Sequence, residues 1–593
     1  MTAILGLNFQ HADSSAALVV DGRLVAAVAE ERFGRRLKHD LAFPKAAIRA
    51  VLAIGGVSAK EVNYVAVPHD TRKNLFEKFR YVCTRPLSGF GAALDNRRRA
   101  RAEKNVVAGV AEACGEAPDL MTAELINVEH HLAHIASAYY CSPFESRTAG
   151  FSFDGSGDFV SAMAARCEGT KIKIVDRVHL PHSLGFFYTA CCQFIGFDEF
   201  GEEYKVMGLA PFGQDRFAEF MQRNLRFDED KWFSLTPGYF GMHSGGEWKL
   251  NEDSRITTGR LFTEKWIEEI GVPRQRREEI TQRDKDLARS CQNHFEGVAM
   301  HCFRRLHKLV PSKQVVYAGG CALNGVANAR VCRDTPFEEV YLQPAASDEG
   351  LSLGAALWTW HNVVGGHERF HMRHASWGPE YPAIVAKRAA ESAKTPLRQV
   401  EFNQITDVVA QLLRLGLVVG WYQGRSEWGP RALGNRSILA DPTRPEMKDV
   451  INRKIKRREM FRPFAPSVPR EKVSHYFEQD IFSPFMMHVV KVRAEWRERL
   501  PGVTHIDGTG RLHSVDRETN PLFYDLIEAF GRYSGIPIVL NTSFNESEPI
   551  VDTPEQAVQC FLRTGLDALC IGNHVLVKDE HEFALANACR ARV

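Results

Sequence analysis

The first 180 residues of the chain carry the same order of sequence patterns twice. Three short runs with strand-like composition open the chain, at residues 3–9, 14–21 and 23–29. Asp21-Gly22 joins the last two and is typical of a hairpin turn. A helical stretch at 44–54 and a strand at 64–68 follow, and from Gly150 three more strands are predicted up to about Val178. The sequence therefore predicts an α/β fold in which one unit occurs twice.

This repeat resembles the duplicated core of the actin, sugar-kinase and heat-shock ATPase superfamily. In that architecture glycine-rich hairpins from both halves face the phosphates of a nucleotide, because glycine lets backbone N–H groups approach closely. Two such stretches are present, Asp154-Gly155-Ser156-Gly157-Asp158 and Gly319-Gly320-Cys321-Ala322-Leu323-Asn324. Each of them alone is also explained by a structural turn.

The length indicates more than one domain. At 593 residues the chain is long enough for two to four. Residues 361–395 are mixed and rich in His, Arg, Pro and Gly, so they are predicted to link an N-terminal domain at 1–360 to a C-terminal domain at 396–593. No leader and no stretch of transmembrane length is recognisable, so a cytoplasmic location without a membrane partner is expected.

Charge and cysteine content argue against several classes of protein. The 75 basic and 73 acidic residues leave a net charge of +2, which argues against a protein that coats nucleic acid. The thirteen cysteines contain no CxxC pair, so neither a zinc ribbon nor a disulfide framework is indicated. Scattered cysteines of this kind are typical of a reducing cytoplasm.

Histidines gather where a predicted strand at 125–128 becomes a helix. His130 and His134 are four residues apart, so they lie on one helix face and can offer two imidazole nitrogens to one metal ion. His131, one residue after His130, points away from this helix face. Asp348 lies at another strand-to-helix junction, and two histidines with one carboxylate leave open positions on a divalent ion. The alternative is that the histidines are core or capping residues and that Asp348 is a helix N-cap.

The most basic part of the chain lies after the predicted linker. A solvated helix face explains Arg453, Lys454 and Arg457. Arg431 and Arg462, by contrast, sit among Gly, Pro and Phe, where a cation is partly buried and needs an anionic partner. Planar guanidinium groups suit phosphate or carboxylate, so these two residues indicate an anion site.

Several motifs in order complete the pattern: Asp13-Ser14-Ser15-Ala16, Glu30-Glu31-Arg32-Phe33 with Lys38-His39, His130-His131-x-x-His134, Asp154-Gly155-Ser156-Gly157-Asp158, Glu203-Tyr204-Lys205-Val206-Met207-Gly208-Leu209-Ala210-Pro211, Gly319-Gly320-Cys321-Ala322-Leu323-Asn324, Gly429-Pro430-Arg431-Ala432-Leu433-Gly434, Arg462-Pro463-Phe464-Ala465-Pro466 and Asn541-Thr542-Ser543-Phe544-Asn545. By these motifs the chain resembles the NodU-type O-carbamoyltransferases, which modify nodulation factors and antibiotics such as tobramycin, cephamycins and ansamycins. The resemblance covers nearly the whole chain.

The resemblance implies a fold and a two-stage reaction. In the family the N-terminal domain is similar to the ATPase-fold protein of tRNA threonylcarbamoylation, and the C-terminal domain to YrdC, an α/β enzyme that makes threonylcarbamoyl adenylate. The YrdC-like domain is implied to form carbamoyl adenylate from carbamoyl phosphate and Mg-ATP, with release of phosphate and pyrophosphate. The first domain is implied to pass the carbamoyl group to a hydroxyl of a small-molecule natural product while AMP leaves.

The resemblance also implies the site residues. Carbamoyl phosphate and ATP are implied to bind Arg431, Lys456, Arg462, Arg511, Ser543 and Asn545. The nucleotide or adenylate in the first domain is implied to contact Lys38, Asp154, Gly155, Ser156, Gly157, Lys205, Gly319, Gly320 and Asn324. A divalent metal, which is iron in the family, is implied at His130, His134 and Asp348, although spacing alone does not select iron over manganese or zinc. His11 matches the family's proposed catalytic histidine, and the alternative is a loop histidine that only binds substrate.

Two rival readings stay open. Both domain types have relatives in tRNA modification, and the run Arg97 to Arg101 can contact phosphates, but the near-neutral charge favours a small-molecule acceptor over nucleic acid. The second alternative is a carbohydrate kinase of the same ATPase superfamily, but this function would leave the YrdC-like half without a role. Hydrogenase maturation factors need paired CxxC fingers, which are absent.

The acceptor pocket is predicted to involve the insertions at about 70–120 and 215–280. Monomer and homodimer are both compatible with the sequence.

Overall fold

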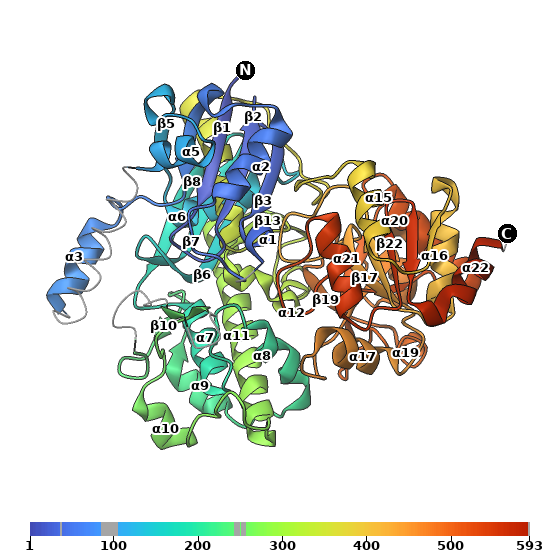
Figure 1. The fold of residues 1–593 in the computed structure, drawn as a ribbon. Coiled ribbons are helices and arrows are strands. Elements are labelled where there is room, and N and C mark those ends of the chain that lie inside the picture. The colour runs from blue at the N-terminus through green and yellow to red at the C-terminus, as the bar shows by residue number, and fades with distance from the viewer. Residues whose placement is uncertain (36–37, 85–104, 242–248, 251–255, 591–593) are drawn as a thin grey trace. The chain divides into compact units, whose positions relative to one another are not determined.

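The structure is a computed structural model that describes residues 1–35, 38–84, 105–241, 249–250 and 256–590 (Figure 1). The chain divides into two compact units, Met1–Met372 and Arg373–Val593. The basic run Arg97 to Arg101 lies outside the described residues. Across the described ranges, no helix combines the length and the apolar character needed to cross a bilayer.

Unit 1 is built on two five-stranded sheets. Their strands are β1 (Ala3–Asn8), β2 (Ser15–Val20), β3 (Arg23–Ala29), β4 (Val62–Val67) and β5 (Glu124–Asn127) in the first sheet, and β6 (Thr148–Gly157), β7 (Val160–Glu168), β8 (Lys171–His179), β13 (Gln314–Ala318) and β14 (Glu339–Tyr341) in the second. The spatial orders are β3-β2-β1-β4-β5 and β8-β7-β6-β13-β14. In both sheets three consecutive strands are antiparallel and two later strands add in parallel. Strand order and direction therefore confirm the predicted repeat.

Two helices connect these sheets through close packing. α14 (Leu351–Thr359) packs on β1, β2 and β4 of the first sheet, and α6 (His130–Tyr139) packs on β6, β7 and β13 of the second. The helices also pack on each other, and a Cβ atom at Gly354 of α14 would lie only 1.9 Å from the carbonyl oxygen of Ala133 in α6. The missing side chain of Gly354 thus permits the approach that brings the starts of both helices together.

The outer face of the first sheet is covered by α2 (Lys45–Gly55) and α5 (Val106–Ala113), which share an apolar core with its strands. Within the described residues, the other α-helices of unit 1 are α1 (Glu31–Gly34), α3 (Leu75–Thr84), α7 (Leu184–Phe194), α8 (Tyr204–Leu209), α9 (Ala218–Asn224), α10 (Glu264–Ile270), α11 (Gln282–Leu309), α12 (Gly325–Asn328) and α13 (Val331–Asp334). Four short strands form two further pairs, β9 (Leu225–Arg226) with β10 (Ser234–Leu235) and β11 (Lys249–Leu250) with β12 (Ile256–Thr257). The unit is therefore a mixed α/β fold, as predicted.

Unit 2 contains one mixed sheet of nine strands in the order β15-β23-β22-β16-β17-β21-β18-β20-β19. The strands are β15 (Leu397–Gln399), β16 (Val419–Tyr422), β17 (Arg436–Ala440), β18 (Ala465–Pro469), β19 (His488–Lys491), β20 (Thr509–Val515), β21 (Val539–Ser543), β22 (Ala568–Ile571) and β23 (His574–Val577). The helices are α15 (Ala383–Ser392), α16 (Ile405–Arg414), α17 (Met447–Val450), α18 (Val473–Tyr476), α19 (Ala494–Arg497), α20 (Pro521–Ser534), α21 (Pro554–Arg563) and α22 (Glu582–Arg590). Residues of α16, α20 and α22 form one apolar core with the sheet, around the fully buried Trp421.

The predicted linker at 361–395 contains the boundary between the units. Its later part forms α15, because Ala386, Ala389 and Ala390 are buried and the helix packs on α21 of unit 2. The solvated helix face predicted for Arg453 and Lys454 is confirmed, since both residues are helical and exposed. α17 passes at Ile451 into η8, a π-helical segment (Ile451–Lys456) that ends where Arg457 takes a left-handed conformation with φ 44°.

Candidate metal centre and active site

The candidate site of unit 1 is a group of two histidines and two aspartates, His130, His134, Asp154 and Asp348, called here the His/Asp cluster. The histidines lie on the first two turns of α6, and Asp154 lies in the last part of β6. Asp348 begins η5 (Asp348–Gly350), the short 3-10 helix before α14. One ligand atom of each residue lies within 4.8 Å of the others. The three residues predicted as metal ligands therefore come together, and Asp154, which was predicted to contact a nucleotide, joins them.

Both imidazole rings face the same pair of carboxylate oxygens. The Nε2 atom of His134 lies 3.1 Å from Oδ2 of Asp154 and 3.3 Å from Oδ1 of Asp348. The Nε2 atom of His130 lies 3.8 Å from each of these two oxygens. Two nitrogens and two oxygens thus converge on one point.

The donor set fits a divalent metal ion. His130 and His134 are completely buried, and neither ring nitrogen of His130 makes a hydrogen bond to a described residue. A buried polar atom left without a partner costs about 1 to 3 kcal/mol, so a ligand for His130 would stabilise the site. Imidazole nitrogens with carboxylate oxygens suit iron, manganese and zinc.

The charges of the cluster favour a cation at the same point. Burial lowers the pKa of His130, so its ring is neutral near pH 7 and can offer a lone pair. Burial alone would lower the pKa of His134 as well, but Asp154 and Asp348 outweigh it and raise this pKa to about 9. The two carboxylates therefore stabilise a positive charge between them, and a metal ion competes for that place with the proton of His134.

The start of α6 is fixed by groups outside the cluster. Oδ2 of Asp158 accepts hydrogen bonds from the backbone N–H groups of His130 at 2.9 Å and Asp70 at 3.0 Å. A Cβ atom at Gly157 would lie 2.0 Å from the His130 ring, so only glycine leaves room for this imidazole. His131 points away, as predicted, and bonds to the Ser152 hydroxyl at 2.7 Å.

Two more histidines border the cluster. His11 follows β1, its Nδ1 is paired with Oδ2 of Asp348, and its ring centroid lies 5.5 Å from that of His130. His69 follows β4, and its buried ring stacks on His130 with centroids 6.0 Å apart. His11 was predicted from the sequence, whereas His69 was missed. β1 and β4 are neighbouring parallel strands, so their carboxyl ends meet at one edge of the sheet. The position of His69 directly after β4 was therefore a signal that could have placed it beside His11.

The predicted nucleotide-binding glycines also border the cluster. Gly319 has φ 103° and donates its N–H to the Ala346 carbonyl at 2.7 Å. A Cβ atom at Gly320 would lie 2.9 Å from Oδ1 of Asp154, and the N–H of Gly155 donates to this same oxygen at 2.7 Å. Both glycine-rich stretches therefore meet at Asp154, with Ser156 and Gly157 completing β6.

Two of the three other predicted nucleotide-binding residues take part in structural interactions. Lys205 donates to Oε1 of Glu202 at 2.6 Å, and Asn324 caps α12 by accepting from the N–H of Ala327 at 3.2 Å. Lys38 is half-buried in the loop after α1. Their contact with a nucleotide stays a prediction.

The predicted anion site of unit 2 is brought together in part. Nζ of Lys456 donates to Oγ of Ser543 at 3.2 Å and to Oδ1 of Asn545 at 2.6 Å. Burial and then the charge of Arg511 lower the pKa of Arg431 well below its ordinary value. Arg462 is paired with Oε2 of Glu459 at 3.5 Å. Lys456 is buried and the three arginines are partly buried, and cations in such surroundings favour binding of an anion.

A residue missed from the sequence holds the loop that carries Arg431. Oε1 of the buried Glu427 accepts hydrogen bonds from the backbone N–H groups of Leu433 and Asn435, both at 2.8 Å, and of Arg436 at 3.1 Å. One carboxylate oxygen thus fixes three peptide groups at the end of the loop. No spacing rule pairs a carboxylate with backbone groups six to nine residues away.

Comparisons with known proteins agree over most of the chain. Residues 3–357 match the family description Carbamoyltransferase N-terminus, and residues 410–578 match Carbamoyltransferase C-terminus. Nodulation protein NolNO of Sinorhizobium fredii is 35% identical over 96% of this chain and 79% of its own length. The 3'-hydroxymethylcephem-O-carbamoyltransferase of Amycolatopsis lactamdurans is 31% identical over 43% of this chain and 47% of its own. Among solved structures, HypF of T. kodakarensis overlaps 61% of this chain and 48% of its own at 13% identity and a TM-score of 0.30, a likeness too loose to support an argument.

Proposed function

The chain belongs to the carbamoyltransferase family, and from this premise we propose that it moves the carbamoyl group of carbamoyl phosphate, through an ATP-dependent carbamoyl adenylate, to a hydroxyl of a small molecule. A relative that covers part of the chain is named for O-carbamoyl transfer to a hydroxymethylcephem, which supports a small hydroxylated acceptor. Activation is assigned to unit 2, which in this proposal is YrdC-like, and transfer to unit 1.

Activation needs fixed cations, because carbamoyl phosphate, carbamate and ATP are all anions. Water releases phosphate from carbamoyl phosphate, and an oxygen of the resulting carbamate attacks the α-phosphorus of Mg-ATP while pyrophosphate leaves. Arg431, Arg462 and Arg511 are assigned to the phosphate and carbamate groups. Lys456, which bonds to Ser543 and Asn545, is held in place for the same purpose. Glu427 positions the Arg431 loop.

Transfer needs a proton acceptor, since a hydroxyl is a poor nucleophile near pH 7. The hydroxyl oxygen attacks the carbamoyl carbon, the bond from this carbon to the AMP oxygen breaks, and the proton moves to Nε2 of His11. The pair of Nδ1 with Asp348 orients the ring and stabilises the protonated form. A divalent ion in the His/Asp cluster would supply positive charge for phosphate oxygens. The glycine-rich stretches at Asp154 are assigned to the adenylate.

The convergence of the four cluster residues beside His11 is the observation that carries this proposal. The test combines carbamoyl phosphate, ATP and a panel of hydroxylated natural products with the full chain, and detects pyrophosphate, AMP and carbamoylated products by mass spectrometry. Carbamoyl-phosphate-dependent pyrophosphate release is expected. Its complete absence, with a correctly folded protein, would overturn the adenylate route.

We predict that the cluster binds metal and that transfer depends on it. His130→Ala and Asp348→Asn should each lose bound metal, measured by elemental analysis, together with carbamoyl transfer. Pyrophosphate release should persist with Mg-ATP, because it is assigned to unit 2. His301→Ala is the matched control, since this histidine of unit 1 bonds to the Lys231 carbonyl away from the cluster. If both cluster variants kept their full metal content, His130 and Asp348 would not be metal ligands and their role would be structural.

A further inference from the structure

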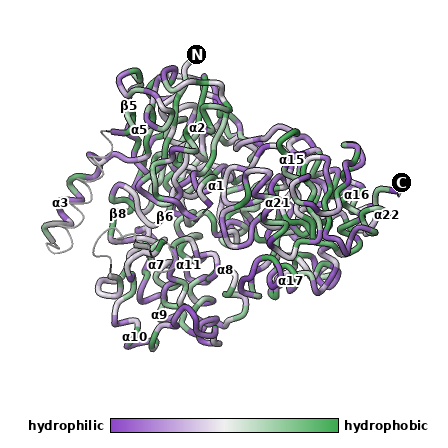
Figure 2. The backbone as a smooth tube through the Cα atoms, in the orientation of Figure 1, coloured by the Kyte–Doolittle hydropathy of each residue, from purple (hydrophilic) through white to green (hydrophobic). Residues whose placement is uncertain are grey.

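Arg177 lies on β8, the edge strand of the second sheet, and its guanidinium is bonded to a buried group. Hydrophilic and hydrophobic residues alternate along the first part of β8 (Figure 2). Lys171 and Lys173 in this part are exposed, and exposed lysines are typical of edge strands, where they oppose pairing with another chain. The side chain of Arg177, by contrast, is only 29% exposed and is paired with Glu129. A solvated strand face therefore does not explain Arg177.

The partner of Arg177 is the residue directly before the helix that carries the cluster histidines. Nε of Arg177 donates to Oε1 of Glu129 at 3.0 Å, and Nη2 donates to Oε2 at 2.9 Å, so the pair is bidentate. Glu129 is 3% exposed and is the N-cap residue of α6, which begins at His130. Among the described residues, Arg177 is the one cation paired with this carboxylate. A buried carboxylate that loses its cation is strongly destabilised, so Glu129 depends on Arg177 for its position.

The start of α6 is held at two separate points. The side chain of Glu129 does not cap the helix, although Glu129 is in the N-cap position. Asp158 takes this part, because its Oδ2 accepts from the backbone N–H of His130 at 2.9 Å. The carboxylate of Glu129 is left to face Arg177. One contact thus fixes the first N–H of the helix, and the other fixes the side chain just before it.

Asn74 connects these two points. Its Nδ2 donates to the carbonyl oxygen of Asp158 at 2.9 Å and to Oε1 of Glu129 at 3.3 Å. Asn74 has φ 55°, a left-handed conformation that asparagine adopts more readily than most residues. The turn before α3 therefore places an amide between the two acidic residues, and one hydrogen-bonded framework surrounds the start of α6.

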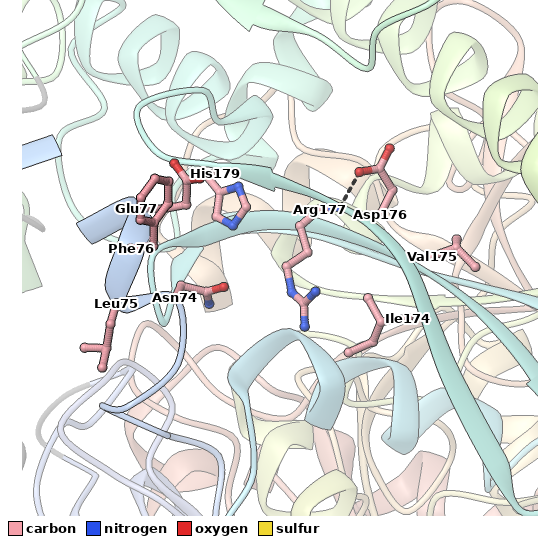
Figure 3. Close-up of a pocket in the computed structure, with 9 residues that line it drawn as sticks. All are labelled: Asn74, Leu75, Phe76, Glu77, Ile174, Val175, Asp176, Arg177 and His179. Atoms are coloured by element: carbon pink, nitrogen blue, oxygen red, sulfur yellow. Dashed lines mark hydrogen bonds between the residues drawn. The ribbon is translucent and has the colours of Figure 1, made fainter. Parts of the chain in front are cut away.

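Asn74 and Arg177 lie on two sides of a pocket of about 450 Å³ between the start of α3 and β8 (Figure 3). It is lined by residues 74–77 on one side and by residues 174–177 and 179 on the other. No residue of the His/Asp cluster lines it. Small solutes can therefore reach Arg177 at a place where they do not contact the candidate metal ligands.

The start of α6 decides where both cluster histidines lie. His130 and His134 belong to the first two turns of this helix, so a shift of its first residues displaces both imidazoles. The two aspartates come from other elements and would not follow this shift. Residues that orient metal ligands typically contribute about 10- to 100-fold to metal affinity.

We propose that Arg177 is a positioning residue of the metal centre. It acts through Glu129 and, together with Asn74 and Asp158, fixes the start of α6 so that both histidines of the cluster meet the two aspartates. This role requires no contact of Arg177 with metal, nucleotide or acceptor. The inference deepens the proposed function, because it rests on the metal centre assigned to the His/Asp cluster.

The test titrates the metal-free full chain with Co²⁺, which imidazole and carboxylate ligands accept, and follows the visible absorption of the bound ion. Arg177→Ala should raise the Kd for Co²⁺ by about 10- to 100-fold and change the absorption spectrum, because the imidazoles are no longer held in one geometry. Arg166→Ala is the matched control, since Arg166 of β7 pairs with Glu168 at 2.9 Å where both side chains are exposed. It should leave Kd and spectrum unchanged. An unchanged Kd in Arg177→Ala would overturn the proposal.

Rescue separates positioning from a general loss of structure. Arg177→Ala leaves a space beside the pocket, so methylguanidinium can enter and pair with Glu129. It should lower the Kd of this variant toward the wild-type value, whereas sodium chloride at the same concentration should not. Arg177→Lys keeps the charge but not the bidentate geometry, so its Kd should lie between those of wild type and Arg177→Ala. If Arg177→Ala does not fold, Arg177→Lys carries the test, and a wild-type Kd in it would overturn the proposal.

A double-mutant cycle tests whether Arg177 acts through Glu129. Glu129→Gln keeps the size of the side chain and removes the buried charge, so no carboxylate is left without a cation when Arg177 is also replaced. Arg177→Ala should therefore raise the Kd for Co²⁺ by a smaller factor in the Glu129→Gln background than in the wild type. The same factor in both backgrounds would show that Arg177 does not act through Glu129, which contradicts the proposal.

These measurements stand apart from the proposed reaction. If the chain makes no carbamoyl adenylate, the adenylate route fails and Arg177 is still judged by Co²⁺ affinity. Pyrophosphate release is assigned to unit 2 and should be equal in wild type and Arg177→Ala, so a fall in this release would contradict a role confined to the metal centre. If the wild type binds no Co²⁺, the metal centre and the positioning role are both wrong. If Arg177→Ala binds Co²⁺ like the wild type, only the positioning role is wrong.

Discussion

His11 is the residue on which the transfer step depends most directly. Its Nδ1 is paired with Asp348, and the proposal assigns the hydroxyl proton to Nε2. His11→Asn keeps a side chain of similar reach but removes the basic nitrogen, so carbamoyl transfer should fall by about 100- to 10,000-fold. Adenylate formation should continue, and mass spectrometry of quenched reactions would detect the intermediate. A normal maximal rate with only weaker acceptor affinity would show that His11 binds the acceptor and is not the base.

The pair of His39 with Asp13 gives unit 1 a stability that depends on pH. Burial alone would lower the pKa of His39, but the carboxylate 2.6 Å away raises it to about 9. A raised pKa means that the protonated histidine stabilises the fold fully below pH 6.5 and that this contribution is lost as the pH rises through 9. His39→Gln should cost about 2 kcal/mol of unfolding free energy at pH 6 and almost nothing at pH 10, as measured by urea unfolding. An equal cost at both pH values would contradict the ion pair.

Spacing in the sequence was enough for some site residues and not for others. His130 and His134 were predicted because a helix places residues four apart on one face, and Asp348 because it begins a helix after a strand. Asp154 was assigned to a nucleotide because its glycine-rich surroundings are typical of a phosphate loop. Its place beside His134 depends on where β6 ends against α6, which is a tertiary distance.

The packing of α14 on α6 is the element-scale feature that assembles the cluster. Gly354→Ala would place a methyl group against the Ala133 carbonyl, so α14 must shift and the protein should lose about 1 to 3 kcal/mol of unfolding free energy. Metal content should fall with it, because Asp348 and His130 lie at the starts of these helices. Gly297→Ala in α11 is the matched control. Its new methyl group meets open space, and alanine should stabilise the helix by up to about 1 kcal/mol. Equal stability of the two variants in urea would show that α14 does not need the glycine.

Local patterns predicted elements where one face is buried, but not the type of hydrogen bonding within a helix. The strands β1, β2 and β3 appear within one residue of the predicted bounds of 3–9, 14–21 and 23–29, because alternating apolar runs and the Asp21-Gly22 turn define them. The helix that carries Arg453 and Lys454 is present, but its hydrogen bonding changes at Ile451 from the α-helix α17 to the π-helical η8. Ile451, Asn452 and Ile455 of η8 are buried while Arg453 and Lys454 are exposed, and no local pattern distinguishes this π-helical segment from an α-helix.

At the scale of the whole molecule, the two stages of the proposed reaction belong to different units. The proposed anion site, with Arg431, Lys456 and Arg511, lies in unit 2, and the His/Asp cluster lies in unit 1. Neither group of residues contributes to the other site in this proposal. Loss of one stage should therefore leave the chemistry of the other intact.

We predict that Arg462→Ala abolishes activation and spares the metal centre. Removing one fixed cation from a centre where charge develops should lower carbamoyl-phosphate-dependent pyrophosphate release by about 100- to 1,000-fold. Bound metal should be unchanged, because the His/Asp cluster contains no residue of unit 2. Glu459→Gln is the control, since it removes the partner at 3.5 Å from Arg462 but keeps the cation, so pyrophosphate release should persist. His130→Ala should give the opposite pattern, with pyrophosphate released and no carbamoylated product. If Arg462→Ala released pyrophosphate at the normal rate, the assignment of this arginine to the anion site would be wrong, whatever the outcome for carbamoyl transfer.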